Sequence, residues 1–104
     1  MARAATTTDA FNAIAEPRRR EIIDLLNDGR DWAVGDIVVN MRMAQPSVSK
    51  HLDVLHKVGV VTVVKRGKHR LYRLQAERLI SVHEWVAGVV QKGKLPRSCA
   101  IDSL

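Results

Sequence analysis

The amino-acid sequence predicts a mainly α-helical domain with one β-hairpin, in the order α-α-α-α-β-β-α. Apolar residues recur at helical spacing in four segments before residue 60 and again after residue 75. Between these segments, residues 60–74 are rich in β-branched residues on either side of a Gly67-Lys68 pair, a pattern typical of a hairpin. The chain has 104 residues, of which 46% are hydrophobic, so it can form one domain with one small core.

The expected domain covers residues 8–90, between flexible segments at 1–7 and 91–104. Residues 1–7 are small and polar, and residues 91–104 include Gly93 and Pro96. A short first helix begins at Thr8 or Asp9 and has Phe11, Ile14 and Ala15 on one side.

Three further helices follow from local start and stop signals. The second begins at Pro17, because proline suits a first helical turn, and ends at residues 27–29. We expect Asp31 to cap the third helix, which runs to about Met41. The fourth has Pro46 in its first turn, ends at Gly59 and carries a buried stripe of apolar side chains: Val48, Leu52, Leu55 and Val58.

The hairpin and the last helix complete the pattern. The strands are expected at residues 60–65 and 70–74, joined through Gly67-Lys68, and the last helix at residues 76–90. Two adjacent helices joined by a short turn and followed by a basic hairpin predict a winged helix-turn-helix.

Positive charge is concentrated in one part of the chain. The formal net charge is +6. The segment from Val54 to Ala76 has no Asp or Glu but contains six cations: Lys57, Lys65, Arg66, Lys68, Arg70 and Arg73. A cluster of this kind is typical of a surface that binds phosphates, and it indicates double-stranded DNA as a partner.

Two groups of side chains are candidates for DNA contact. The first turns of the fourth helix carry short hydrogen-bonding and cationic residues that suit the major groove: Gln45, Ser47, Ser49, Lys50 and His51. The hairpin tip carries residues that suit phosphates or the minor groove: Lys65, Arg66, Lys68, His69 and Arg70.

Three stretches resemble the ArsR/SmtB repressors. They are the fourth helix, residues 44–55 (AQPSVSKHLDVL), the hairpin with its approach, residues 58–61 and 65–74, and the second-helix start, residues 15–20 (AEPRRR). The resemblance implies a repressor that binds an inverted-repeat operator as a homodimer formed by the first and last helices. The expected dimer-interface residues are Phe11, Ile14, Leu79, Val82, Trp85, Val86 and Val89.

The sequence departs from that family at its metal and capping positions. Metal-sensing relatives carry a Cys-x-Cys pair where this chain has Ala33 and Gly35, and Ala44 stands where the family usually has a capping Ser. No set of four zinc ligands is evident, so we expect no metal and no cofactor. The single cysteine, Cys99, cannot form an internal disulfide, which fits the cytoplasm and gives no sign of a redox role.

Other functions remain to be weighed against DNA binding. The same scaffold could serve as a protein-interaction module, although the segment without acidic residues argues against it. A small-molecule effector between the terminal helices stays open, and the sequence does not identify one. No phosphate-binding glycine loop or nucleophile–base pair is evident, so we expect no enzyme. We also expect no signal peptide and no membrane span.

Overall fold

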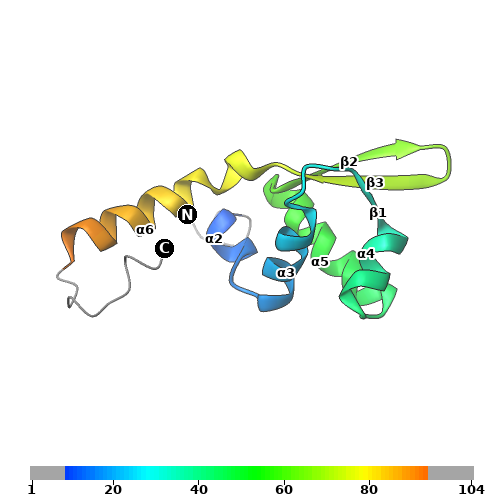
Figure 1. Cartoon of the computed structure of the whole chain (residues 1–104), viewed down its shortest axis with the longest axis horizontal. Coiled ribbons are helices and arrows are strands. Elements are labelled where there is room, and N and C mark those ends of the chain that lie inside the picture. Colours follow the sequence, from blue (N-terminus) through cyan, green and yellow to red (C-terminus); the bar gives the residue numbers. More distant parts are fainter. Residues whose placement is uncertain (1–8, 94–104) are drawn as a thin grey trace, which may run out of the picture.

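The computed structural model describes residues 9–93. Its elements are α2 (Ala10–Ala13), α3 (Pro17–Leu26), β1 (Trp32–Ala33), α4 (Val34–Met41), α5 (Gln45–Val58), β2 (Val61–Arg66), β3 (His69–Leu74), the 3-10 helix η1 (Ala76–Leu79) and α6 (Ile80–Lys92). Helices α3, α4 and α5 gather beneath the β2–β3 hairpin, whereas α6 runs away from them (Figure 1). The expectations for residues 1–7, for Cys99 and for the rest of the tail from residue 94 lie outside the described residues.

The second and fourth predicted helices are confirmed. Helix α3 begins at Pro17, and the Glu16 side chain caps it by accepting a hydrogen bond of 2.7 Å from the Arg18 amide. Helix α5 ends at Gly59, whose φ of 90° is a conformation that glycine adopts without steric cost.

The predicted hairpin is also confirmed. Strands β2 and β3 pair in antiparallel register from Val61↔Leu74 to Arg66↔His69. Only Gly67 and Lys68 are left in the loop, and Gly67 has the positive φ of 60° that a two-residue hairpin turn requires.

The expected role of Asp31 as a helix cap is wrong. Helix α4 begins at Val34, after Ala33. Residues 32–33 are extended instead, because they pair with β3 as a third strand, in the order β1-β3-β2. The Asp31 carboxylate lies beside this sheet and pairs with the Arg73 guanidinium at 2.7 Å.

The first and last helices differ slightly from the predicted ones. Helix α2 has only four residues, with the Asp9 side chain accepting from the Asn12 amide at 2.8 Å. The last predicted helix starts as the 3-10 helix η1 and continues as α6 to Lys92, two residues beyond the predicted end.

The core lies between α3, α4, α5 and the sheet. Fully buried side chains include Ile22 and Leu26 from α3, Ile37 from α4, and Leu52 and Leu55 from α5. The predicted stripe of α5 therefore packs inward, and this packing fixes which face of α5 remains exposed. No helix between residues 9 and 93 has the length and apolar character needed to cross a bilayer.

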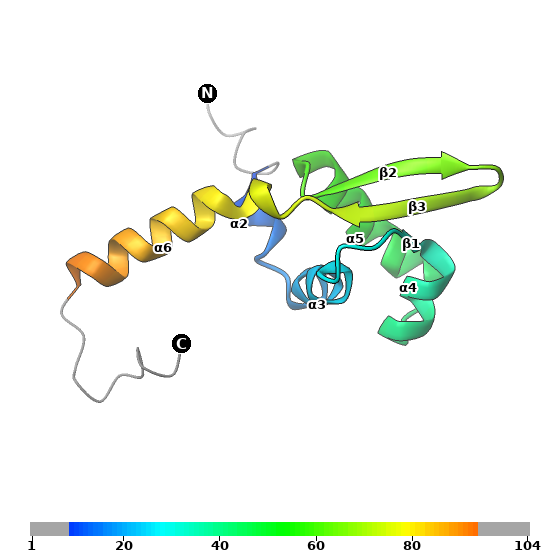
Figure 2. The same ribbon diagram turned by 45° about the horizontal axis from the view of Figure 1, so that its top comes forward.

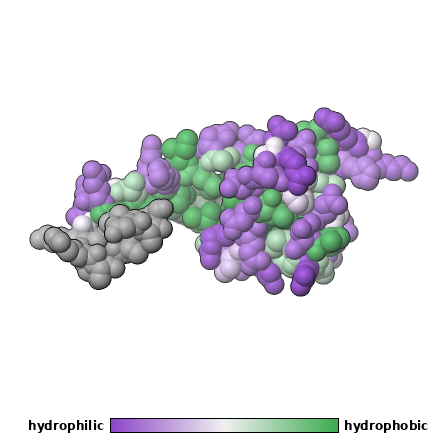
Figure 3. All heavy atoms as spheres, viewed as in Figure 1, coloured by the Kyte–Doolittle hydropathy of each residue, from purple (hydrophilic) through white to green (hydrophobic). Residues whose placement is uncertain are grey.

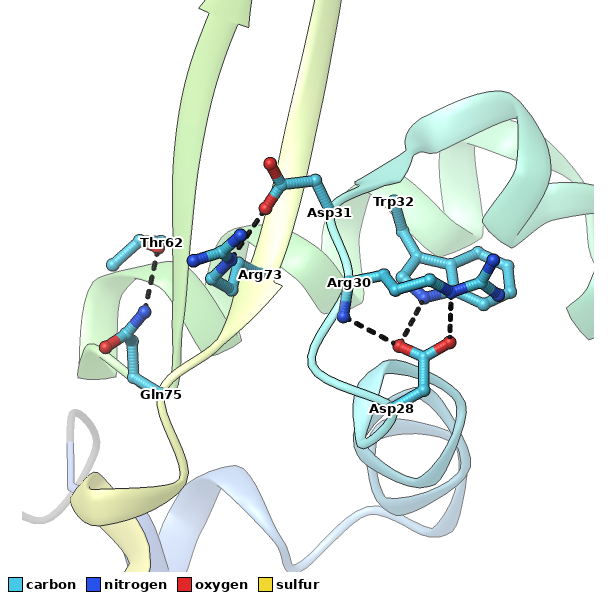
Figure 4. A network of polar contacts seen from close by, with 7 residues as sticks. All are labelled: Asp28, Arg30, Asp31, Trp32, Thr62, Arg73 and Gln75. Atoms are coloured by element: carbon cyan, nitrogen blue, oxygen red, sulfur yellow. Dashed lines mark hydrogen bonds and ion pairs between the residues drawn. The ribbon is translucent and has the colours of Figure 1, made fainter.

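A polar network joins the end of α3 to the sheet (Figure 4). Asp28 accepts hydrogen bonds from the Arg30 amide at 2.9 Å, the Trp32 indole at 3.1 Å and the Arg30 guanidinium at 2.7 Å. These donors hold the pKa of Asp28 at about 2, below its ordinary 3.8. The Arg30 guanidinium also lies over the Trp32 ring, 5.2 Å from its centre, so Trp32 is held at the start of β1.

Candidate nucleic-acid interface

Helix α5 exposes the residues that sequence reasoning assigned to the major groove. Gln45, Ser47, Ser49 and Lys50 are exposed, and His51 is half-buried. His51 is less accessible because it lies beside the buried stripe, whereas Lys50 projects from the opposite side of the helix. The first turns of α5 therefore present short polar side chains and one cation to solvent.

These residues do not all lie on one side of α5. Gln45 and Ser49 line a cavity together with residues of the hairpin, so both face the wing. Ser47 is two residues from Ser49 and lies roughly 160° away around the helix axis. A groove-binding helix would thus use Gln45 and Ser49 on its wing side, Lys50 at its outer side, and Ser47 on the far side.

The wing carries cations without acidic partners. All five predicted wing residues are exposed. The ion pairs formed within residues 9–93 join Arg18, Arg30, Lys57 and Arg73 to carboxylates, and none involves Lys65, Arg66, Lys68, His69 or Arg70. Two of the six cations counted in the sequence, Lys57 and Arg73, are therefore compensated, and the four on the wing are not.

Two cavities lie between α5 and the hairpin. One, of about 280 Å³, is lined by Gln45 and Ser49 from α5, Lys68, His69, Arg70 and Tyr72 from the hairpin, and Ala33, Val34 and Gly35 from the start of α4. The other, of about 310 Å³, includes Ser49, Asp53 and His56 from α5 and Lys65 and Arg70 from the hairpin. Ser49, Arg70 and Tyr72 line both, so the predicted helix and wing residues share one concave surface.

Sequence reasoning missed several residues of this surface. Asp53 and His56 follow Ser49 at i+4 and i+7, so the helical period already placed them on the same face. Tyr72 and the segment Ala33–Gly35 carried no such local signal, because tertiary packing alone brings them beside α5.

The two helices of the helix-turn-helix, α4 and α5, share an unusual start. Their N-caps are Ala33 and Ala44, neither of which can offer a side-chain hydrogen bond. Helices α2 and α3 are instead capped by Asp9 and Glu16. The missing cap that the sequence predicted at Ala44 is thus confirmed and recurs at α4. Both starts keep unsatisfied amide donors and a partial positive charge.

The turn between α4 and α5 holds Arg42 in a left-handed conformation. Its φ is 55° and its ψ is 42°, the one positive φ outside glycine in residues 9–93. This conformation costs a non-glycine residue roughly 1–2 kcal/mol. The left-handed Arg42 therefore sets the direction of α5 relative to α4, and the backbone at this residue is strained.

A second, apolar surface lies on the terminal helices. None of the 13 residues of α6 is buried, and Trp85 is 60% exposed. Phe11 of α2 meets Trp85 edge to face, with ring centres 5.9 Å apart. Green, apolar atoms gather where α6 meets α2, and purple, hydrophilic atoms cover much of the hairpin (Figure 3).

The predicted interface residues fall into three groups on that surface. Phe11, Trp85, Val86 and Val89 are exposed. Ile14 and Val82 are half-buried. Leu79 packs against the core of its own chain. The exposed apolar side chains of α6 also include two that the predicted interface omitted, Ile80 and Val90.

The protein is extended for a chain of its length. The Cα radius of gyration is 16.0 Å, whereas a compact domain of this size has about 13 Å. The difference follows from α6, which projects from the body in both views (Figures 1 and 2). Among residues 9–93, α6 packs beside α2 and η1, and it projects away from the other helices and the sheet.

Metal-binding side chains do not gather within residues 9–93. No three His, Cys, Asp or Glu residues of this range lie close enough together to hold an ion. Ala33 and Gly35, where the sequence analysis expected the Cys-x-Cys pair of metal-sensing relatives to be missing, line the cavity beneath the wing.

Comparison with known proteins identifies the family. Residues 16–63 match the model of the bacterial regulatory protein, arsR family. The transcriptional repressor SdpR of Bacillus subtilis (strain 168) is 34% identical over 85 residues, which cover 82% of this chain and 93% of the repressor. The arsenical resistance operon repressor of Staphylococcus xylosus is 32% identical over 71% of this chain and 70% of its own length.

Solved structures give the same result for the fold. A crystal structure of an ArsR family transcriptional regulator aligns with a TM-score of 0.68 and 28% identity over 81% of this chain and 89% of its own. The solution structure of a homodimeric winged helix-turn-helix DNA-binding domain from Mycobacterium bovis aligns with a TM-score of 0.61 and 29% identity, covering 83% and 82% of the two chains. With the fold, the helix-turn-helix and the basic wing in agreement, this chain belongs to the ArsR family of bacterial regulatory proteins.

Proposed function

We propose that this protein is a transcriptional repressor that binds double-stranded DNA as a homodimer. The observation that carries the proposal is the continuous concave surface on which the exposed start of α5 meets a wing whose cations have no acidic partner within residues 9–93. Polar side chains beside uncompensated cations are what base reading and phosphate binding require. We expect the protein to act in the cytoplasm, beside its DNA.

Each part of the surface has a separate task in this proposal. Helix α5 enters the major groove, where Gln45 can pair with adenine, Lys50 with guanine, and Ser47 and Ser49 with bases or phosphates. The half-buried His51 contributes from the flank of the helix. The wing residues hold the adjacent backbone or minor groove: Lys65, Arg66, Lys68, His69 and Arg70.

The homodimer is proposed to form through α2 and α6. Burying Trp85, Val86 and Val89 against a second copy would cover the apolar face that the single chain leaves exposed. The homodimeric relative from Mycobacterium bovis supports this arrangement. A two-fold symmetric pair places two α5 helices in successive major grooves, so the operator is an inverted repeat.

A protein-interaction module is the alternative function. It would use the same fold without selective DNA binding, and the exposed apolar face of α6 would then dock another protein. The wing cations favour DNA instead, because phosphates would neutralise charges that have no acidic partner within residues 9–93, and the hairpin lies at the opposite end of the molecule from α6 (Figure 1). We propose no catalytic activity, cofactor or metal, and the proposal requires no effector.

The test is a fluorescence-anisotropy titration at two salt concentrations with two DNA duplexes. One comes from the region upstream of the protein's own coding sequence, and the other is a scrambled duplex of equal composition. We expect affinity for the first duplex to exceed that for the second by at least about a thousandfold, and to fall steeply with salt. Equal affinity for both duplexes, vanishing together as salt rises, would refute the repressor proposal and favour the interaction module.

A further inference from the structure

The basic run Arg18–Arg20 has no task in the surface proposed to bind DNA. It opens α3, and its three arginines behave differently. Arg18 forms an exposed ion pair with Glu21 at 3.0 Å, one helical turn along α3. Arg19 and Arg20 instead direct their guanidinium groups at backbone carbonyls of another helix, α2.

Three hydrogen bonds connect these two arginines to the end of α2. Arg19 donates from Nε to the Ala13 carbonyl at 2.8 Å and from Nη2 to the Asn12 carbonyl at 2.9 Å. Arg20 donates from Nη1 to the carbonyl of Ile14, the C-cap residue of α2, at 2.6 Å. Arg19 is half-buried and Arg20 is exposed, so the two bonds of Arg19 are the better shielded from water.

The sequence explains why α2 needs donors from outside. In a continuing α-helix the Ala13 carbonyl would accept from the amide of residue 17, but Pro17 has no N–H. The Arg19 guanidinium supplies the missing donor. Helix α2 also has only four residues, whereas isolated helices shorter than about 12 residues are marginal in water. Its position therefore depends on contacts with the rest of the chain.

Helix α2 connects the apolar surface of α6 to the body of the protein. It packs against both α5 and α6, and in both views it lies between α6 and the helices beneath the hairpin (Figures 1 and 2). Its Phe11 ring meets Trp85 of α6 edge to face, at an interplanar angle of 86°. The placement of α2 thus decides whether Phe11 and Trp85 form one continuous apolar surface.

We propose that Arg19 is a positioning residue of the homodimer surface: by clamping the end of α2, it holds Phe11 against Trp85 before two chains meet. This inference rests on the homodimer proposed above and names a residue outside the interface on which it depends. Removing a hydrogen bond made by a charged group shifts an equilibrium by about tenfold or more. Because α2 is marginal on its own, its ordered fraction in the free chain would fall, and both protomers of a dimer bear this loss.

The first experiment compares Arg19→Gln with Arg18→Gln by sedimentation equilibrium. Glutamine and arginine have similar helix propensities, so α3 itself should be unaffected by either change. We expect the dimer dissociation constant to rise by at least about tenfold in Arg19→Gln. Arg18→Gln loses the same charge from the neighbouring position but only an exposed ion pair, so it should stay within about threefold of wild type. Equal dissociation constants for the two variants would overturn the proposal.

Arg19→Lys separates the geometry of the clamp from its charge. Lysine keeps the charge but lacks the planar fork that reaches two carbonyls at once. We expect its dimer dissociation constant to lie between those of wild type and Arg19→Gln. An Arg19→Lys protein that dimerises as tightly as wild type would show that charge alone suffices and would overturn the clamp.

A double-mutant cycle separates positioning from a general loss of stability. If Arg19 acts by placing Phe11, Arg19→Gln should have little left to disturb once that ring is removed. We expect Arg19→Gln to change the dissociation constant by less than about threefold in a Phe11→Ala background. Additive losses for the two substitutions would show that Arg19 merely stabilises the fold, and would overturn the positioning role.

Proton NMR distinguishes failure of this inference from failure of the homodimer. We expect a nuclear Overhauser contact between the Phe11 and Trp85 rings in wild type and Arg18→Gln, and its loss in Arg19→Gln. A wild type that stays monomeric would refute the homodimer, whereas loss of the ring contact in Arg19→Gln alone would still support the clamp. A dimer whose association and ring contact both survive Arg19→Gln would keep the homodimer and overturn the clamp.

Discussion

Replacing Trp85 by Ala tests whether the exposed face of α6 is the dimer interface. A tryptophan buries up to about 250 Å², and Trp85 is 60% exposed in the single chain. About 150 Å² per protomer therefore remains to be covered by a partner. At about 25 cal/mol per Å², two such side chains contribute at most roughly 7 kcal/mol to association. If half of that area is covered, the loss is about 3–4 kcal/mol and the dimer dissociation constant rises by about 10²–10³-fold.

Sedimentation equilibrium over a range of protein concentrations measures this change. The helical content of Trp85→Ala, followed by circular dichroism, should match wild type, because Trp85 is largely solvent-exposed within its own chain. Val39→Ala is the control, since Val39 is 73% exposed on α4, away from α6. A Trp85→Ala protein that dimerises as tightly as wild type, or a Val39→Ala protein that dissociates equally, would refute the assignment of this face.

Three other substitutions test separate parts of the account. In anisotropy titrations, Lys50→Ala should lower affinity for the operator more than affinity for scrambled DNA. Lys68→Ala should lower both affinities about equally, and it should reduce by about one the slope of log binding constant against log salt concentration. Ala44→Ser should stabilise the protein by about 0.5–2 kcal/mol in thermal unfolding, because α5 has no side-chain cap; an unchanged melting temperature would count against a free α5 start. Asp28→Asn should destabilise the protein above pH 4, and the difference from wild type should shrink as pH falls from about 4 to about 2, since the folded-state pKa of Asp28 is lowered to about 2. If the stability difference between Asp28→Asn and wild type stays constant over that pH range, the hydrogen bonds to the Asp28 carboxylate are not the cause of that difference.

The elements that the sequence predicted best carry their signals locally. Helix α5 combines an apolar period with Pro46 at its start and Gly59 at its end, and the hairpin has Gly67 at its turn. Each of these signals acts within a few residues, so it needs no knowledge of the rest of the fold.

The parts that escaped prediction depend on residues distant in sequence. Strand β1 has two residues, too few for any period, and exists because Trp32 and Ala33 pair with Tyr72 and Leu71. That pairing also explains why Asp31 meets Arg73 rather than a helix start.

The candidate site was predicted in the same partial way. Its α5 and wing residues follow from composition and helical period. The cavity that joins them also needs the start of α4 and the buried Tyr72, which come together only through tertiary packing. The distribution of Ser47 and Ser49 on opposite sides of α5 likewise required the orientation of the buried stripe.

Hydroxyl-radical footprinting on a selected operator tests the central claim, that a two-fold dimer reads DNA with its paired α5 helices and wings. DNA is first selected from a random pool by the wild-type protein, and the bound duplex is then footprinted. We predict an inverted repeat with two equivalent protected half-sites whose centres lie about 10–10.5 base pairs, or a multiple of one turn, apart. A selected pool without a shared sequence, or a single protected segment without symmetry, would contradict the claim.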